Sequence, residues 1–72
     1  MTHEYGLRTP EEILRKALEK ETQARDFYAK LALECTVDFV KELLQTLQNE
    51  EAKHMHMIRK MQGRLESGKR LI

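Results

Sequence analysis

Two residues of this sequence have side-chain types and a spacing that could do chemistry together: Glu51 and His54. On a helix, residues three apart lie on the same face, about one turn from each other. A carboxylate and an imidazole in that position can bind the same divalent metal ion, for which both groups are common ligands. The spacing alone is weakly specific, because charged surface helices contain Glu-x-x-His by chance.

The stripe of residues around this pair makes the spacing informative. Residues at alternating steps of four and three form it: Val40, Leu44, Leu47, Glu51, His54, Ile58, Met61 and Leu65. This heptad pattern predicts the buried seam of a coiled coil or helix bundle. Glu51 and His54 occupy two adjacent positions in its middle. An ionised carboxylate is costly there unless it is paired or bound to a metal.

The first half of the chain predicts a second helix with a similar seam. Thr9 and Glu12 can form a capping box, and Pro10 suits the first helical position. From there, alternating steps of three and four produce another stripe: Leu14, Ala17, Glu21, Ala24, Tyr28, Leu31 and Cys35. Four further apolar residues broaden this face: Ile13, Leu18, Phe27 and Ala32. Here too a glutamate, Glu21, lies in the middle of the seam.

Together the two stripes predict an all-α fold, an antiparallel two-helix hairpin formed by a single domain over residues 1–72. The expected segments are a tail over 1–9, a first helix over 10–34 and a second helix over 38–67. The short connection between the helices is typical of an αα-hairpin. Two glycines, Gly63 and Gly68, are candidates for the end of the second helix.

Folding the chain at Thr36 brings the glutamates of both seams to one level. Glu21 and Glu51 are equally far from Thr36, roughly 22 Å at 1.5 Å per residue. His54 follows about one turn beyond them. Alone, a seam histidine is more often a hydrogen-bonded core residue, and a seam glutamate often extends into solvent. Three such side chains in adjacent layers predict a metal site made of Glu21, Glu51 and His54.

Size and composition limit the remaining possibilities. A chain of 72 residues has a marginal core, so we expect help from oligomerisation or a metal. The single cysteine, Cys35, excludes an internal disulfide framework and suits a reducing cytoplasm, where we expect the protein. No apolar run approaches the ~20 residues of a membrane span, and the N-terminus lacks the apolar segment of a signal peptide. The net charge is +1, and we expect neither nucleic acid nor a membrane as a partner.

The sequence resembles the ferritin-like superfamily, in its rubrerythrin and encapsulated-ferritin branches. Two segments carry the resemblance: Glu21-x-x-Ala24-x-x-Phe27-Tyr28-x-x-Leu31-Ala32 and Glu50-Glu51-x-x-His54. It covers roughly Leu14 to Met61, and the spacing between its two glutamates also fits. One departure is decisive. A ferritin-like bundle has four helices and two copies of these motifs, whereas this chain has two helices and one copy.

The resemblance therefore implies that two chains form a homodimer, or a higher homo-oligomer, around one ferritin-like four-helix bundle. Such a bundle takes a Glu from each of two helices and a Glu-x-x-His from each of the others. Two copies of Glu21, Glu51 and His54 would bind two iron ions per dimer, with manganese or zinc as possible substitutes. By resemblance, Glu51 bridges the metals, Glu21 is a terminal ligand, and His54 binds through one ring nitrogen. Tyr28 is a second-shell residue near the site or an ordinary core aromatic residue.

Other residues near the pair have weaker assignments. Glu50 is interpreted as a surface charge, with an entry-side carboxylate as the alternative. His56 points away from His54 and is interpreted as a surface or subunit contact. The methionines that follow, Met55, Met57 and Met61, are expected to provide adaptable packing at an interface. No specific role follows for Cys35 or for the basic C-terminal tail.

Three functions are consistent with these features. The first is ferrous iron oxidation with oxygen, a ferroxidase activity in iron storage or oxidative defence, inside an encapsulating shell or with an electron donor as partner. The second is peroxide reduction of the rubrerythrin type. It is weakened because no Cys-x-x-Cys pair is present to build an electron-transfer domain. The third is a non-enzymatic helical assembly module whose polar seam residues fix the register.

Overall fold

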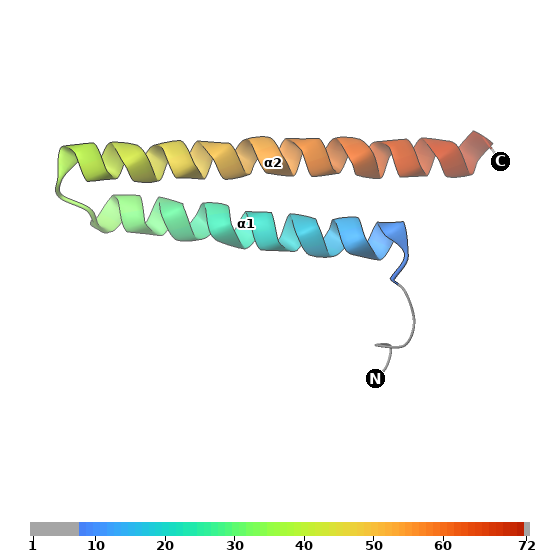
Figure 1. Cartoon of the computed structure of the whole chain (residues 1–72), viewed down its shortest axis with the longest axis horizontal. Coiled ribbons are helices and arrows are strands. Elements are labelled where there is room, and N and C mark those ends of the chain that lie inside the picture. The colour runs from blue at the N-terminus through green and yellow to red at the C-terminus, as the bar shows by residue number, and fades with distance from the viewer. Residues whose placement is uncertain (1–7, 72) are drawn as a thin grey trace.

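Two long antiparallel α-helices make up the computed structural model, which describes the backbone of residues 8–71 and the side chains of residues 8–68. Helix α1 covers Pro10–Glu34 and helix α2 covers Asp38–Leu71, and they lie side by side (Figure 1). Among the described residues there is no strand, which confirms the all-helical hairpin. Its pairing with a second copy stays a prediction. Most of the predicted tail lies outside the described residues.

Helix α1 begins at the predicted capping box. The Thr9 hydroxyl accepts a hydrogen bond from the backbone N–H of Glu12 at 3.1 Å. In return, the Glu12 carboxylate accepts one from the backbone N–H of Thr9 at 2.9 Å. These reciprocal bonds satisfy two of the amide groups that a helix start leaves without intrahelical partners. They also lower the pKa of Glu12, chiefly through the bond from the Thr9 backbone.

A three-residue connection turns the chain between the helices. The Cys35 backbone is extended, with φ −89° and ψ 130°, and its N–H donates to the carbonyl of Ala32 at 3.4 Å. The carbonyl of Val37 accepts the first hydrogen bond of α2, from the N–H of Lys41 at 2.9 Å. Asp38 lies in the first turn, where its carboxylate favours the positive end of the helix dipole. The short link fixes both helices at the same starting level.

Helix α2 ends later than the predicted residue 67. It continues through both Gly63 and Gly68 to Leu71, so neither glycine stops it. Neither glycine has a positive φ, the conformation that a glycine helix stop adopts. A glycine inside a helix costs only about 1 kcal/mol relative to alanine, which a long helix tolerates. With 34 residues against 25 in α1, α2 extends past the start of α1 (Figure 1).

The core between the helices is small. Among the residues whose side chains are described, only Ala32 of α1 and Met55 of α2 are buried, and the Met55 side chain is 2% exposed. Met55 was expected at an interface, and the interface at which it packs is the one between the two helices of the hairpin. It lies at the level of the predicted metal site and packs inside the hairpin. Most other residues between the helices are half-buried, because each helix covers only one side of the other.

The seam predicted for α2 divides into two rows. Four of its members form one row and are half-buried between the helices: Leu44, Glu51, Ile58 and Leu65. Leu47, in the other row, is half-buried as well. Three others are exposed: Val40, His54 and Met61. A heptad stripe has two edges, and a single neighbouring helix covers only one of them. The second edge therefore remains open beside the hairpin seam.

Met55→Ala tests the importance of this core. Truncating a buried methionine removes transfer free energy and leaves a cavity, so we expect the free energy of unfolding to fall by about 2–4 kcal/mol. Leu33→Ala is the matched control, because Leu33 is 84% exposed and its truncation should change stability by less than about 0.5 kcal/mol. Chemical denaturation followed by circular dichroism measures both. Equal losses in the two variants would contradict the assignment of Met55 to the core.

Candidate metal centre

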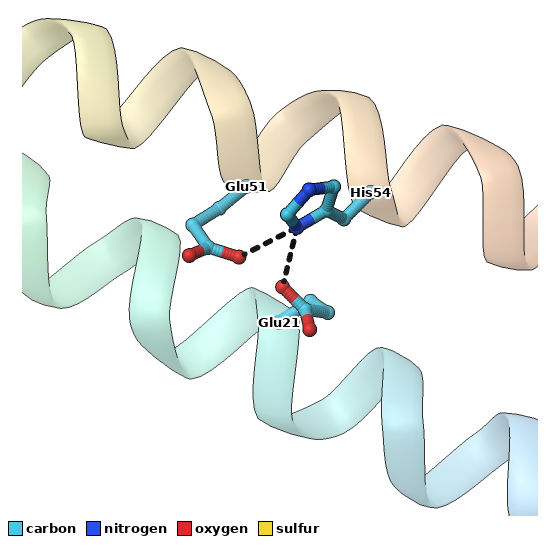
Figure 2. Close-up of side chains that lie close together, drawn as sticks. All are labelled: Glu21, Glu51 and His54. Carbon is cyan, nitrogen blue, oxygen red and sulfur yellow. Dashed lines mark hydrogen bonds and ion pairs between the residues drawn. The ribbon is translucent and has the colours of Figure 1, made fainter.

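Three predicted ligands meet at one point between the helices. Glu21 comes from α1, and Glu51 and His54 come from successive turns of α2 (Figure 2). The Nδ1 atom of His54 lies 3.3 Å from a carboxylate oxygen of Glu21 and 3.3 Å from one of Glu51. Glu21 and Glu51 lie at one level because each is equally far from the three-residue connection. The convergence expected from the sequence is therefore present in the structure.

Exposure is graded across the three side chains. Glu51 is 18% exposed, Glu21 is 28% exposed and His54 is 49% exposed. The site consequently has a floor between the helices and an open side at His54. The heptad stripe predicted a buried histidine, and that prediction is wrong for the single hairpin. His54 lies on the edge of the stripe that α1 does not cover.

Hydrogen bonds among the three side chains shift their pKa values in the metal-free site. The hydrogen bond that Glu51 shares with Glu21 lowers the pKa of Glu21 and raises the pKa of Glu51. The hydrogen bonds of His54 to Glu21 and then to Glu51 raise the pKa of its imidazole above 6.5. Two carboxylates at this separation share a proton more readily than both ionise. In the metal-free site the raised pKa values of His54 and Glu51 mean that both groups keep their protons to a higher pH than isolated side chains would.

The donor set fits a divalent transition metal. One ligand atom from each of Glu21, Glu51 and His54 can be chosen so that all three lie within 4.8 Å of one another. Carboxylate and imidazole ligands together suit iron, manganese and zinc. A cation would replace the shared protons and neutralise both carboxylates. Three ligands would leave coordination positions for other groups, and the site is open to solvent on the side of His54.

Other predicted residues lie around the cluster without joining it. Tyr28 is half-buried, and its ring packs against Phe27 with centroids 5.8 Å apart. Among the described residues, the structure gives its hydroxyl no hydrogen bond to the three ligands. His56 is exposed, as expected. Glu50 is half-exposed and lies 3.8 Å from the ammonium group of Lys53.

The sequence analysis did not identify Met55 as the buried residue next to the ligands. Met55 follows His54 directly and fills the space between the helices beside the ligands. A second heptad was present in the sequence and identifies it: Leu44, Gln48, Glu51, Met55, Ile58, Gln62 and Leu65. Because it contains Gln48 and Gln62, this stripe is less apolar than the stripe that begins at Val40. In the structure every member of it is buried or half-buried.

One Glu on a helix and a Glu-x-x-His on its antiparallel neighbour are half of the ligand set of a ferritin-like metal bundle. The sequence model of the family described as Rubrerythrin matches residues 12–72. The chain therefore belongs to the rubrerythrin family, and this membership implies iron binding. Searches of curated proteins and of solved structures found no match to the chain. Within the described residues, no helix is long and apolar enough to cross a membrane.

Metal binding should release protons and strengthen with pH. The pKa values of His54 and Glu51 are raised in the metal-free site, so a cation must displace protons that these groups would otherwise hold. With Zn²⁺ as a redox-inert probe, we expect affinity to rise at least tenfold between about pH 6 and pH 8. Calorimetry in two buffers of different ionisation enthalpy counts the protons released.

The control for this titration is His54→Ala, which removes the imidazole. The variant should bind Zn²⁺ more weakly and release fewer protons at pH 7 than the wild type. A wild-type affinity that stayed constant over this pH range, with no proton release, would contradict the assignment of His54 as a ligand.

Proposed function

We propose that two copies of this hairpin complete a dinuclear iron site and oxidise ferrous iron with dioxygen. One observation carries the proposal: Glu21, Glu51 and His54 converge at a site that is closed on one side and open on the other. Such a cluster is half of the ligand set that a ferritin-like bundle requires. A second hairpin placed over the open side supplies the other half.

Charge supports two metals for each pair of hairpins. Two copies contribute four carboxylates, and these balance the four positive charges of two ferrous ions. Without cations the carboxylates repel one another at close range, and burial in the dimer would increase this repulsion. Iron is both the bound metal and the substrate that gives up electrons to dioxygen. The chain supplies the ligands, holds the two ions together and limits the access of water.

Each side chain has a distinct part in this proposal. Glu51 is the least exposed of the three and lies between the helices, which suits a carboxylate shared by two metals. Glu21 approaches from α1 as a ligand to one metal. His54 turns its Nδ1 atom toward the carboxylates, so this nitrogen would bind the metal. Tyr28 follows Glu21 by seven residues on the same face of α1, and from there it would assist electron transfer.

Thermal stability in the presence of iron tests metal binding. A metal that binds only the folded state stabilises it by RT ln(1 + [L]/Kd), about 4 kcal/mol at a thousandfold excess over Kd. We expect anaerobic ferrous iron to raise the melting temperature of the wild type strongly. Glu21→Gln keeps the shape of the side chain but removes two carboxylates per dimer, so this increase should disappear.

Glu19→Gln is the matched control, since Glu19 is exposed on α1 and its carboxylate lies 3.8 Å from the ammonium group of Lys16, away from the three ligands. It should keep the full response to iron. Identical melting temperatures of the wild type with and without iron would refute the metal site and leave the helical assembly module as the better explanation.

Family membership favours peroxide reduction as the second candidate. The two activities are separated by their oxidants. In stopped-flow measurements, protein loaded anaerobically with ferrous iron is mixed with oxygenated buffer or with hydrogen peroxide. For a ferroxidase we expect rapid oxidation with oxygen, and at least a tenfold loss in Glu51→Ala and His54→Ala. Rapid oxidation by peroxide alone, with slow oxidation by oxygen, would instead identify a peroxide reductase.

A further inference from the structure

One side of the hairpin carries an apolar surface next to the ligands. We call it the open face, and its apolar members are Ile13, Ala17, Ala24, Phe27 and Leu31 on α1, and Val40, Leu43, Leu47, Met57 and Met61 on α2. Ile13, Phe27, Leu43 and Met57 are each more than half exposed. Ile13 and Met61 line one common hollow, so the rows on the two helices lie on the same side. His54 belongs to the α2 row by its spacing.

Six of the ten apolar residues of the open face form pairs that are equally far from the level of the ligands. On α1, Ile13 and Phe27 are equally far from Lys20. On α2, equal distances from Ala52 separate three pairs: Leu43 and Met61, Leu47 and Met57, and Glu50 and His54. Lys20 and Ala52 are themselves equally far from the centre of the connection, so both lie at one level. This level is also that of Glu21 and Glu51.

In an antiparallel two-fold pair of hairpins, residues that are equally far from this level lie opposite one another across the interface. A two-fold axis that crosses the helices at this level places each α1 against the partner's α1 and each α2 against the partner's α2. Ile13 then faces Phe27 of the partner subunit, and Leu43 faces Met61 of the partner subunit. Lys20 lies in the same row, midway between Ile13 and Phe27 and near the axis, where its long side chain can keep the ammonium group in water.

Shape favours the same arrangement. The open end of the hairpin has a hollow of about 520 Å³ between the first turns of α1 and the last turns of α2. The end near the connection has instead protruding apolar side chains, including Phe39, which is 76% exposed. Antiparallel pairing sets one end against the other. It also covers the part of α2 that extends past α1, because the partner's connection end reaches along it (Figure 1).

The antiparallel arrangement determines which group lies near the second ring nitrogen of His54. Its Nδ1 atom points at Glu21 and Glu51, while its Nε2 atom points away from both carboxylates (Figure 2). Glu50 lies one turn before His54 on the same open face and is half-exposed. Symmetry about Ala52 brings Glu50 of one chain level with His54 of the other.

We infer that a second copy of this chain lies antiparallel across the open face and that the partner subunit's Glu50 accepts a hydrogen bond from the Nε2–H of His54. This inference rests on the proposed function, since it assumes that two hairpins form the site. In this arrangement Glu50 acts as a positioning residue for the His54 imidazole. A carboxylate that accepts from the second nitrogen of a ligand imidazole fixes the ring orientation and tautomer, and raises its basicity toward the metal.

Cysteine cross-linking tests the orientation. In a Cys35→Ser background, Leu43→Cys with Met61→Cys places two thiols on one helix, roughly 27 Å apart, too far for a disulfide within one chain. Antiparallel pairing brings each thiol next to the other one of the partner. We expect a covalent dimer under mild oxidation. The matched pair Phe27→Cys with Leu43→Cys should stay monomeric on a non-reducing gel, because only hairpins with both connections at the same end would join these positions.

Glu50→Leu tests the hydrogen bond. Leucine suits an apolar face, so sedimentation should show a dimer at least as stable as the wild type. The affinity for Zn²⁺ should nevertheless fall about 10–100-fold, the usual loss when the hydrogen-bond partner of a ligand histidine is removed. Lys53→Ala is the control, because it breaks the ion pair of Glu50 while leaving its carboxylate, and its Zn²⁺ affinity should equal that of the wild type.

The outcomes separate this inference from the function on which it rests. Cross-linking of the control pair instead of the 43/61 pair, or an unchanged Zn²⁺ affinity in Glu50→Leu, would overturn the inference. The dinuclear site would stand in either case if Glu21→Gln still abolished metal binding. A wild-type protein that bound no Zn²⁺ and no ferrous iron would refute the function and the inference together.

Discussion

Two carboxylates held beside one imidazole, in a fold with almost no interior, are the constraint on which this structure depends. Glu21 and Glu51 would repel each other if both were ionised, and the hydrogen bonds that they share with each other and with the imidazole of His54 offset this repulsion. Their approach requires both helices to deliver a glutamate at one level. The three-residue connection provides that level, because it gives neither helix any freedom to slide. A longer, flexible connection would let the carboxylates separate into water.

The thinness of the hairpin couples metal binding to assembly. Ala32 and Met55 are the only buried residues in the described part of the chain, so a single hairpin has little hydrophobic stabilisation of its own. The polar cluster lies in the middle of the surface that a second chain would cover. Apolar contacts on both sides would exclude water from the site, and the metal would offset the cost of enclosing the carboxylates. Neither the assembly nor the site would then be stable alone.

Much of this architecture could be predicted because the helix-capping signals and the spacing of the seam residues indicate the same hairpin. Thr9 and Glu12 fixed the start of α1, and equal spacing from the turn predicted the meeting of Glu21 with Glu51. The heptad did not reveal which of its edges faces α1 and which faces outward, since both edges have the same period. The exposure of His54 and the burial of Met55 follow from that ambiguity. The end of α2 was also missed, because the small cost of a glycine inside a helix does not determine whether the helix stops there.

The start of α1 and the end of α2 lie at the same end of the hairpin, which limits how a duplicated gene could encode the whole bundle (Figure 1). In an antiparallel pair, the end of one α2 and the beginning of the other α1 are at opposite ends. Helix α2 has 34 residues and is roughly 50 Å long, so a single chain would need a linker of roughly 15 extended residues along the bundle. A short linker would force both turns to one end and separate Glu50 from the second imidazole. The length of one connection would therefore decide which bundle a fused descendant could build.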